Sequence, residues 1–197
     1  LIILVSMIGI SKIFLKKDTE SKPKVETKII SNIEKYGYTL DDRDTKYMKE
    51  TFKELESILN IDEINKEEYA KVLSKLFIID FYTLSNKINK YDVGSLEYIL
   101  NDKVEIFKNK AMDTIYSDII DNTYKDRVQE LPEITDVEIL EIKKSKFELN
   151  KEEKESYKIT LKFSYKKDLG YDKEGTLHII ENNNKLEVAL YNPKIEK

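Results

Sequence analysis

The sequence predicts an α+β domain in which three main helices precede a four-stranded antiparallel curved sheet. Residues 66–89 hold the strongest helical signal: their centre, LFIIDFYTL, is apolar on nearly every side, and large side chains recur at steps of three and four. Residues 156–167 alternate apolar and polar side chains without a break, as an antiparallel strand with one wet face does. The helical patterns precede the strand patterns, an order typical of α+β folds with helices on one sheet face.

Length and composition exclude several classes of site. The chain has 197 residues, enough for one domain of about 150 residues and a tether. It has no Cys, which excludes disulfides, thiolate metal sites and Cys nucleophiles. Arg, which binds phosphate in bidentate fashion, occurs only at positions 43 and 127, so we expect no nucleic-acid partner. Without metal-spaced His clusters or Gly-rich phosphate loops, we also expect no metal and no cofactor.

The first 15 residues form a mostly apolar run that Ser11-Lys12 interrupts and that Lys16 and Lys17 end. Three interpretations stay open: a membrane anchor, the h-region of a signal peptide, and a buried core helix. We favour a membrane-anchor helix over residues 1–17, because no Ala-x-Ala-like cleavage site follows. We expect this anchor to be truncated, because it is short for a full span and lacks an initiator Met. Lys12, Lys16 and Lys17 by themselves would indicate that the domain is cytoplasmic. The residues that precede the apolar run determine the orientation of the anchor in the membrane. We favour an extracytoplasmic domain.

The remaining boundaries follow from local signals. The expected divisions are a membrane anchor at 1–17, a linker at 18–40 with a short strand at 29–30, and an α+β domain at 41–197. The first helix should cover about 42–60, with Asp41 or Asp42 as its N-cap. Asp102 should cap a third long helix over about 103–124.

Two irregularities are expected in the sheet. Residues 134–149 should form a strand with a bulge, because the apolar positions change phase between Ile139 and Leu140. Residues 175–181 and 185–191 should form a hairpin, because the Asn residues between them suit a tight turn.

The order and lengths of the elements over about residues 41–192 resemble the cystatin-like roll of the nuclear transport factor 2-like superfamily. This roll is shared by nuclear transport factor 2, ketosteroid isomerase and the exported domains of type IV secretion assembly factors. An anchor before such a domain is similar to the last group, which often carries an Asn-Pro-x-Gly segment where this chain has Asn192-Pro193-Lys194. The segments KYGYTLDDRDT and LFIIDFYTL are also similar to uncharacterised single-pass proteins of low-GC bacteria.

In enzymes with this roll, an acid and tyrosines in the pocket carry out general acid–base catalysis. By this resemblance, Asp80 with Tyr82 or Tyr98 is the candidate catalytic group. Asp80 lies in an apolar helical segment, so it must be paired, hydrogen-bonded or protonated. The favoured alternative is that it locks packing by accepting hydrogen bonds from a neighbouring loop or tyrosine. His178 is the only histidine, so any His-based site depends on it, and a non-catalytic strand His is favoured there.

Lys158, Lys162 and Lys166 share one face of the predicted strand 156–167 and form a basic strip. An acidic partner or an anionic cell-wall polymer could bind this strip through charge. A solvated sheet face is the favoured alternative, because nearby acids could neutralise the lysines.

Two functions follow. The favoured one is a membrane-tethered extracytoplasmic interaction or assembly domain without catalytic activity, which contacts the membrane through residues 1–15 and a protein partner at the envelope. The alternative is a small-molecule-binding protein or acid–base enzyme that uses the pocket of the roll. A pocket lined by Asp80 and tyrosines would favour the alternative, and an interior filled by side chains would favour the interaction domain.

Overall fold

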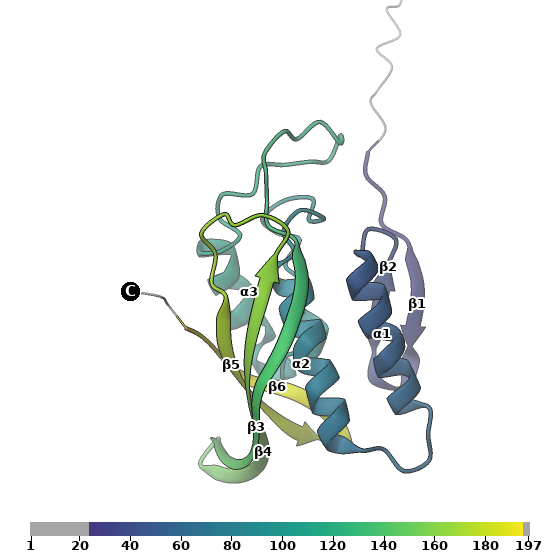
Figure 1. Cartoon of the computed structure of the whole chain (residues 1–197), viewed down its shortest axis with the longest axis vertical. Coiled ribbons are helices and arrows are strands. Elements are labelled where there is room, and N and C mark those ends of the chain that lie inside the picture. Colours follow the sequence, from purple (N-terminus) through teal and green to yellow (C-terminus); the bar gives the residue numbers. More distant parts are fainter. Residues whose placement is uncertain (1–23, 195–197) are drawn as a thin grey trace, which may run out of the picture.

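The computed structural model describes residues 24–194, which form two N-terminal strands, three helices and a four-stranded antiparallel sheet (Figure 1). The α+β class and the order of helices and sheet are confirmed. The strands are β1 (Ile29–Ile33), β2 (Tyr38–Asp41), β3 (Ile134–Leu149), β4 (Glu152–Tyr165), β5 (Glu174–Asn182) and β6 (Lys185–Pro193). The helices are α1 (Lys46–Leu59), α2 (Lys66–Tyr82) and α3 (Val104–Asp113), with 3₁₀ turns at Glu34–Tyr36, Leu96–Tyr98 and Asn101–Lys103.

The core is built around α2, as the sequence predicts. The helix begins at Asn65, whose side-chain oxygen accepts the backbone N–H groups of Glu67 and Glu68 at 3.0 and 3.2 Å. It packs against α1 on one side and against β3, β4 and β6 on another, so side chains are buried around its whole circumference. The helix ends at Tyr82, earlier than the predicted 89, because the N–H groups of Leu84 and Ser85 turn away to Pro132 O.

Helix α1 covers α2 with a single buried stripe: Met48, Phe52, Leu55 and Leu59. Its N-cap is Thr45, whose hydroxyl accepts the N–H of Met48 at 3.2 Å. The prediction that Asp41 or Asp42 is the N-cap of α1 is therefore wrong. Asp41 is instead the last residue of β2, and its carboxylate accepts the N–H of Arg43 at 2.7 Å.

Within the segment 18–40, which the sequence predicts as a linker, the residues from Ile29 onward form the hairpin β1–β2. Gly37 makes the turn with φ +67°, a left-handed conformation that favours glycine. The side chains of Tyr36, Tyr38 and Leu40 enter the core. The hydroxyls of Tyr38 and Tyr69 lie 2.5 Å apart and fasten the hairpin to α2. The strand expected at Ile29–Ile30 is confirmed as the start of β1.

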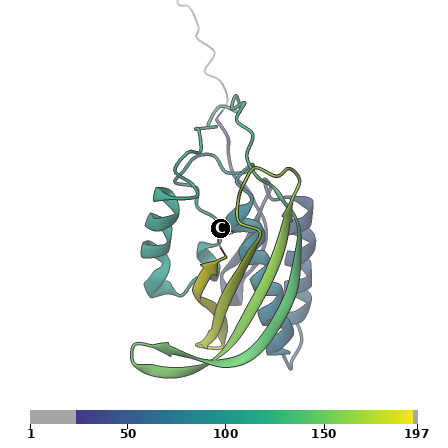
Figure 2. The ribbon, with the colours of Figure 1, turned by 60° about the vertical axis from the view of Figure 1, so that its left-hand side comes forward.

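The large sheet has the order β3-β4-β5-β6, and every neighbouring pair is antiparallel. Its inner face includes Ile159, Leu161 and Phe163 of β4, which are fully buried. The predicted bulge in β3 is confirmed between Ile139 and Glu141. The predicted β5–β6 hairpin turns at Asn183–Asn184, both with positive φ. Figure 2 shows β3 and β4 curving as a long ribbon beyond the other strands.

Helix α3 ends at Asp113 and does not continue to residue 124 as expected. Beyond it, Tyr116 and Ile119 still enter the core. The Tyr116 hydroxyl donates to Phe81 O at 2.8 Å and accepts the N–H of Gly94 at 3.1 Å, so it joins this segment to α2 and to the following loop.

Within residues 24–194, no helix has both the length and the apolar character needed to cross a membrane. The expected anchor at residues 1–17 lies outside the described residues.

Candidate functional site

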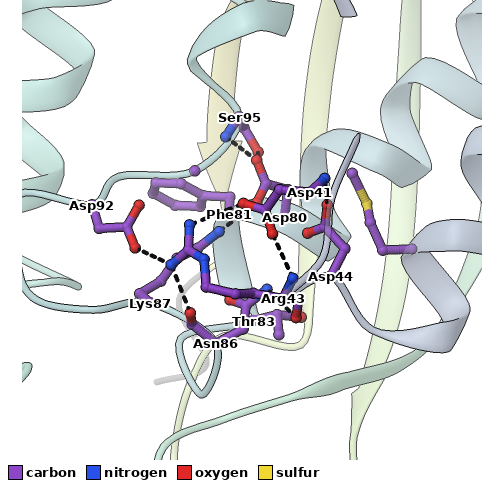
Figure 3. A network of polar contacts seen from close by, with 12 residues as sticks. Asp41, Arg43, Asp44, Asp80, Phe81, Thr83, Asn86, Lys87, Asp92 and Ser95 are labelled. Atoms are coloured by element: carbon purple, nitrogen blue, oxygen red, sulfur yellow. Dashed lines mark hydrogen bonds and ion pairs between the residues drawn. The ribbon is translucent and has the colours of Figure 1, made fainter. Parts of the chain in front are cut away.

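Asp80, the acid inside the central helix, forms an ion pair at the end of α2 (Figure 3). One carboxylate oxygen accepts the Lys87 Nζ at 2.5 Å, and the other accepts the backbone N–H of Ser95. The Lys87 side chain is 6% exposed and that of Asp80 is 16% exposed, so the pair lies almost entirely out of water. Both partners come from the loop after α2, which therefore folds back over the acid.

Two residues allow the loop to approach Asp80 so closely. At Gly94 a Cβ atom would lie 2.5 Å from the Asp80 carbonyl oxygen and 2.7 Å from its carboxylate, so only glycine fits without a shift of backbone. Ser95 has φ +66°, which turns its N–H toward the carboxylate. Its hydroxyl donates to Phe77 O at 2.7 Å and holds the turn against α2.

A second ion-paired layer lies beside the first. Arg43 donates to Asp41 at 2.9 Å, to Asp92 at 2.6 Å and to the carbonyl of Asn86 at 3.0 Å. Asp92 also accepts the N–H of Ile88 at 2.8 Å. Arg43 therefore joins the β2–α1 connection to the loop that covers Asp80.

The charges of these pairs stabilise one another. Burial alone would lower the pKa of Lys87, but the Asp80 carboxylate outweighs it and raises that pKa above its ordinary value. Burial opposes ionisation of Asp92, but hydrogen bonds from Arg43 and from the Ile88 N–H lower its pKa. We conclude that the Lys87 and Asp92 ion pairs stay charged at neutral pH.

Two further acids at the same place take up protons more readily. They border an open depression of about 270 Å³ that also contacts Asp80 and Lys87. Burial raises the pKa of Glu97 to about 7. Hydrogen bonds from the Thr39 N–H at 3.1 Å and from the Thr39 hydroxyl at 2.8 Å lower this pKa, but burial outweighs them. Burial also raises the pKa of Asp44 to about 6. The depression thus has two carboxyl groups that titrate near neutral pH.

The structure does not bring Asp80 together with the hydroxyls of Tyr82 and Tyr98. The Tyr82 hydroxyl lies 2.9 Å from that of Tyr191 and donates to Asp172 at 3.1 Å. The Tyr98 hydroxyl is fully buried, and burial raises its pKa well above the ordinary value, with further contributions from the charges of Glu97 and Asp80. Neither of these two hydroxyls therefore makes a direct hydrogen bond to Asp80.

His178 lies on β5 opposite Lys158 of β4. Its ring packs 5.4 Å from that of Phe147, and its buried Nδ1 has no partner among the described residues. Burial lowers the pKa of His178, and the charge of Lys158 lowers it further, so the ring is neutral at pH 7. Among residues 24–194, no group of three or more His, Asp or Glu side chains is arranged to hold a metal ion.

The three lysines of the predicted strip are exposed, but their surroundings differ. Lys162 lies between Glu138 and Glu174 on the neighbouring strands, and Lys166, one residue beyond β4, is 3.5 Å from Glu133. Lys158 lies instead between Lys143 and His178. The strip is therefore close to neutral at the end near residue 166 and positive at the end near residue 158.

Comparison of the chain with protein-family models, curated proteins and solved structures finds no match. The site must therefore be interpreted from its own geometry. Sequence reasoning missed Lys87 and Glu97, and it did not predict the position of Arg43 and Asp44 beside Asp80. One signal pointed to Lys87: a buried acid needs a cation, and Lys87 follows Asp80 by seven residues in the next loop.

Proposed function

We propose that this chain is a membrane-tethered, extracytoplasmic interaction domain without catalytic activity. The observation that supports this most is a filled interior: the rings of Tyr38, Tyr69, Tyr82, Tyr98, Tyr116, Phe52, Phe77 and Phe163 are almost completely buried in one core. A roll that works on a small molecule keeps a cavity for it. The order of helices and sheet also supports the resemblance to the cystatin-like roll, which we retain as part of the proposal.

The geometry beside Asp80 gives the alternative function less support. The depression beside Asp80 is small, open and polar, whereas typical ligand pockets are larger, about 300–1,000 Å³, and mostly apolar. Both carboxylate oxygens of Asp80 are already engaged, one by the Lys87 ammonium and the other by the Ser95 N–H. We therefore interpret the ion pairs as a lock that fixes the loop and the N-terminal hairpin on α2.

For the interaction surface we propose the outer face of the sheet, at its positive end. Lys158 and Lys143 lie side by side on neighbouring strands there, with His178 on the next strand. Lys143 is partly compensated by Glu141 at 2.6 Å, whereas the residues directly opposite Lys158 on the two neighbouring strands are Lys143 and His178. An acidic partner would be attracted to this end of the strip.

A photoreactive residue at Thr160, between Lys158 and Lys162 on the strand, tests this surface in membranes that contain the full chain. We expect it to capture a discrete partner. Reversing Lys158, Lys162 and Lys166 to Glu should abolish capture, as should Lys158→Glu alone, and wild-type capture should weaken as salt rises. Each exposed substitution should change the free energy of unfolding by no more than about 0.5 kcal/mol.

Lys53→Glu provides the matched control, because it makes the same charge change on the exposed side of α1. It should leave capture unchanged. If capture survives both the triple reversal and high salt, the lysines are a solvated face and the partner binds elsewhere.

The proposed membrane tether leads to a separate prediction. A chain that begins at Lys24 should be soluble, monodisperse and cooperatively folded without detergent, because the described strands and helices all begin at or after Ile29. The full chain should require detergent or vesicles, because residues 1–15 are apolar. Size-exclusion chromatography and thermal unfolding distinguish the two. The reverse outcome, a soluble full chain and an aggregating short one, would show that residues 1–23 belong to the core.

A further inference from the structure

Four residues with exposed apolar or aromatic side chains lie in the loops at the end of the domain where the chain enters. They are Tyr91, Ile120, Tyr124 and Val128, with exposed fractions of 64, 59, 45 and 97%. The last three lie in the connection between α3 and β3, which reaches the same end as Lys24 (Figures 1 and 2). We call these four residues the entry patch. The N–H of Val25 donates to Thr123 O at 2.7 Å, which places the entering chain directly against the patch.

Several hydrogen bonds fix the loop that carries most of the entry patch. The Arg127 guanidinium donates to the carbonyls of Ser85 and Lys87, each at 2.9 Å, and of Ile120 at 3.2 Å. Gln129 donates to Asp118 O and accepts the N–H of Ile120. A loop held this firmly presents its apolar side chains in a fixed position, and apolar side chains gathered on one surface mark a contact site.

The neighbouring loop is joined to the same surface. The N–H of Asn122 donates to Ile88 O at 2.8 Å, and Asn89 donates to Asp121 at 3.2 Å. Tyr91 follows directly, with the Lys90 ammonium 5.2 Å from the centre of its ring. Tyrosine beside lysine suits the headgroup level of a bilayer. The tyrosine ring is apolar, whereas its hydroxyl is polar and can stay hydrated.

We infer that the entry patch rests on the lipid headgroup region of the membrane that holds the tether. This inference depends on the proposed tether. Residues 16–23 separate the apolar run from Lys24, and eight residues plus their flanking bonds reach at most about 30 Å. The patch is therefore held close to the bilayer, and a weak surface contact becomes effective because it is intramolecular.

The charges near the patch indicate which lipid interactions matter. The connection between α3 and β3 carries Asp118, Asp121, Asp126, Glu130 and Glu133 against Lys125 and Arg127. This excess of acids does not favour an electrostatic attraction to anionic lipids. The contact is therefore made by aromatic and apolar side chains at the interface, in the way amphipathic interfacial segments bind.

The chain has no tryptophan, so a single Trp reports on one position. The full chain carrying Val128→Trp would be reconstituted into phosphatidylcholine–phosphatidylglycerol vesicles, with and without brominated acyl chains. We expect a blue-shifted emission that brominated lipid reduces by roughly half, because interfacial side chains insert about 5–10 Å. Adding Ile120→Asp should remove most of this quenching.

Ile61→Trp provides the matched control. Ile61 is similarly exposed, at 52%, but lies in the α1–α2 connection at the opposite end (Figure 1). It should emit at long wavelength and resist quenching. If the vesicles retain the chain but both reporters behave alike, or if Val128→Trp shifts to the blue without quenching, the membrane contact is wrong and the tether stands. If the vesicles do not retain the chain, the tether itself fails and this inference fails with it.

Discussion

Replacing Lys87 with Met should lower the free energy of unfolding by about 3–5 kcal/mol, the usual effect of removing one member of a buried ion pair. Met has a similar length and is apolar, so the change removes the charge and leaves little cavity. The Asp80 carboxylate then keeps the Ser95 N–H but loses its cation, 2.5 Å away, in a place with little access to water. Urea unfolding at pH 7 measures the difference.

Variants at position 80 separate the ion pair from simple packing. Asp80→Ala should likewise destabilise by about 3–5 kcal/mol, because the buried Lys87 ammonium and the Ser95 N–H lose their partner, and Asp80→Asn should be milder because it keeps the shape and an acceptor. In the double variant Asp80→Asn with Lys87→Met, neither charge remains, so much of the loss should be regained. A position-80 variant as stable as the wild type would instead indicate an acid held for a purpose other than folding.

The sequence identifies Asp80 as an unusual acid but not the groups that bind it. An acid among Ile78, Ile79 and Phe81 indicates burial, and burial requires a partner. Which partner it finds depends on the path of the loop after α2. That path is set by Gly94, Ser95 and the Tyr116 hydroxyl, and the last of these comes from a distant part of the chain. No local pattern contains this information.

The same distinction explains the fold predictions. Helix α2 and strand β4 were predictable because each has a strong period of its own and many buried residues. The β1–β2 hairpin was missed because its alternation is short and polar residues surround it, and it is stable only because Tyr38 and Leu40 pack against the core. Its Tyr38–Tyr69 contact joins residues 31 positions apart.

For α3 the error is the opposite one, because the sequence predicted a longer helix than the structure contains. Residues 103–124 keep a helical spacing of apolar side chains, and the prediction of a long helix followed that spacing. The helix ends at Asp113, yet Tyr116 and Ile119 remain buried in a non-helical segment. The apolar spacing was a correct guide to burial and a wrong guide to conformation, because the bonds of the Tyr116 hydroxyl to Phe81 O and to the Gly94 N–H set the path of the chain.

The second large effect is a pH dependence that comes from Glu97. Its ordinary pKa is 4.5, and burial raises the value in the folded chain to about 7, with a smaller contribution from the charge of Asp80 and opposition from the Thr39 hydrogen bonds. Below pH 4.5 the carboxyl is protonated in both states and its burial carries no charge penalty. Between pH 4.5 and 7 only the unfolded chain releases the proton, so stability falls as pH rises.

Glu97→Gln removes this titration and keeps an oxygen that can accept from Thr39. The variant should match the wild type near pH 4.5 and exceed it by about 2–4 kcal/mol at pH 8, because each unit of pKa shift corresponds to about 1.4 kcal/mol. Glu63→Gln, which removes an exposed carboxylate from the α1–α2 connection, controls for the loss of one negative charge and should show no such divergence. Unfolding curves at several pH values give the comparison. If the Glu97→Gln and wild-type curves stay parallel from pH 4.5 to 8, Glu97 is ionised without penalty and the Thr39 hydrogen bonds, rather than burial, dominate its environment.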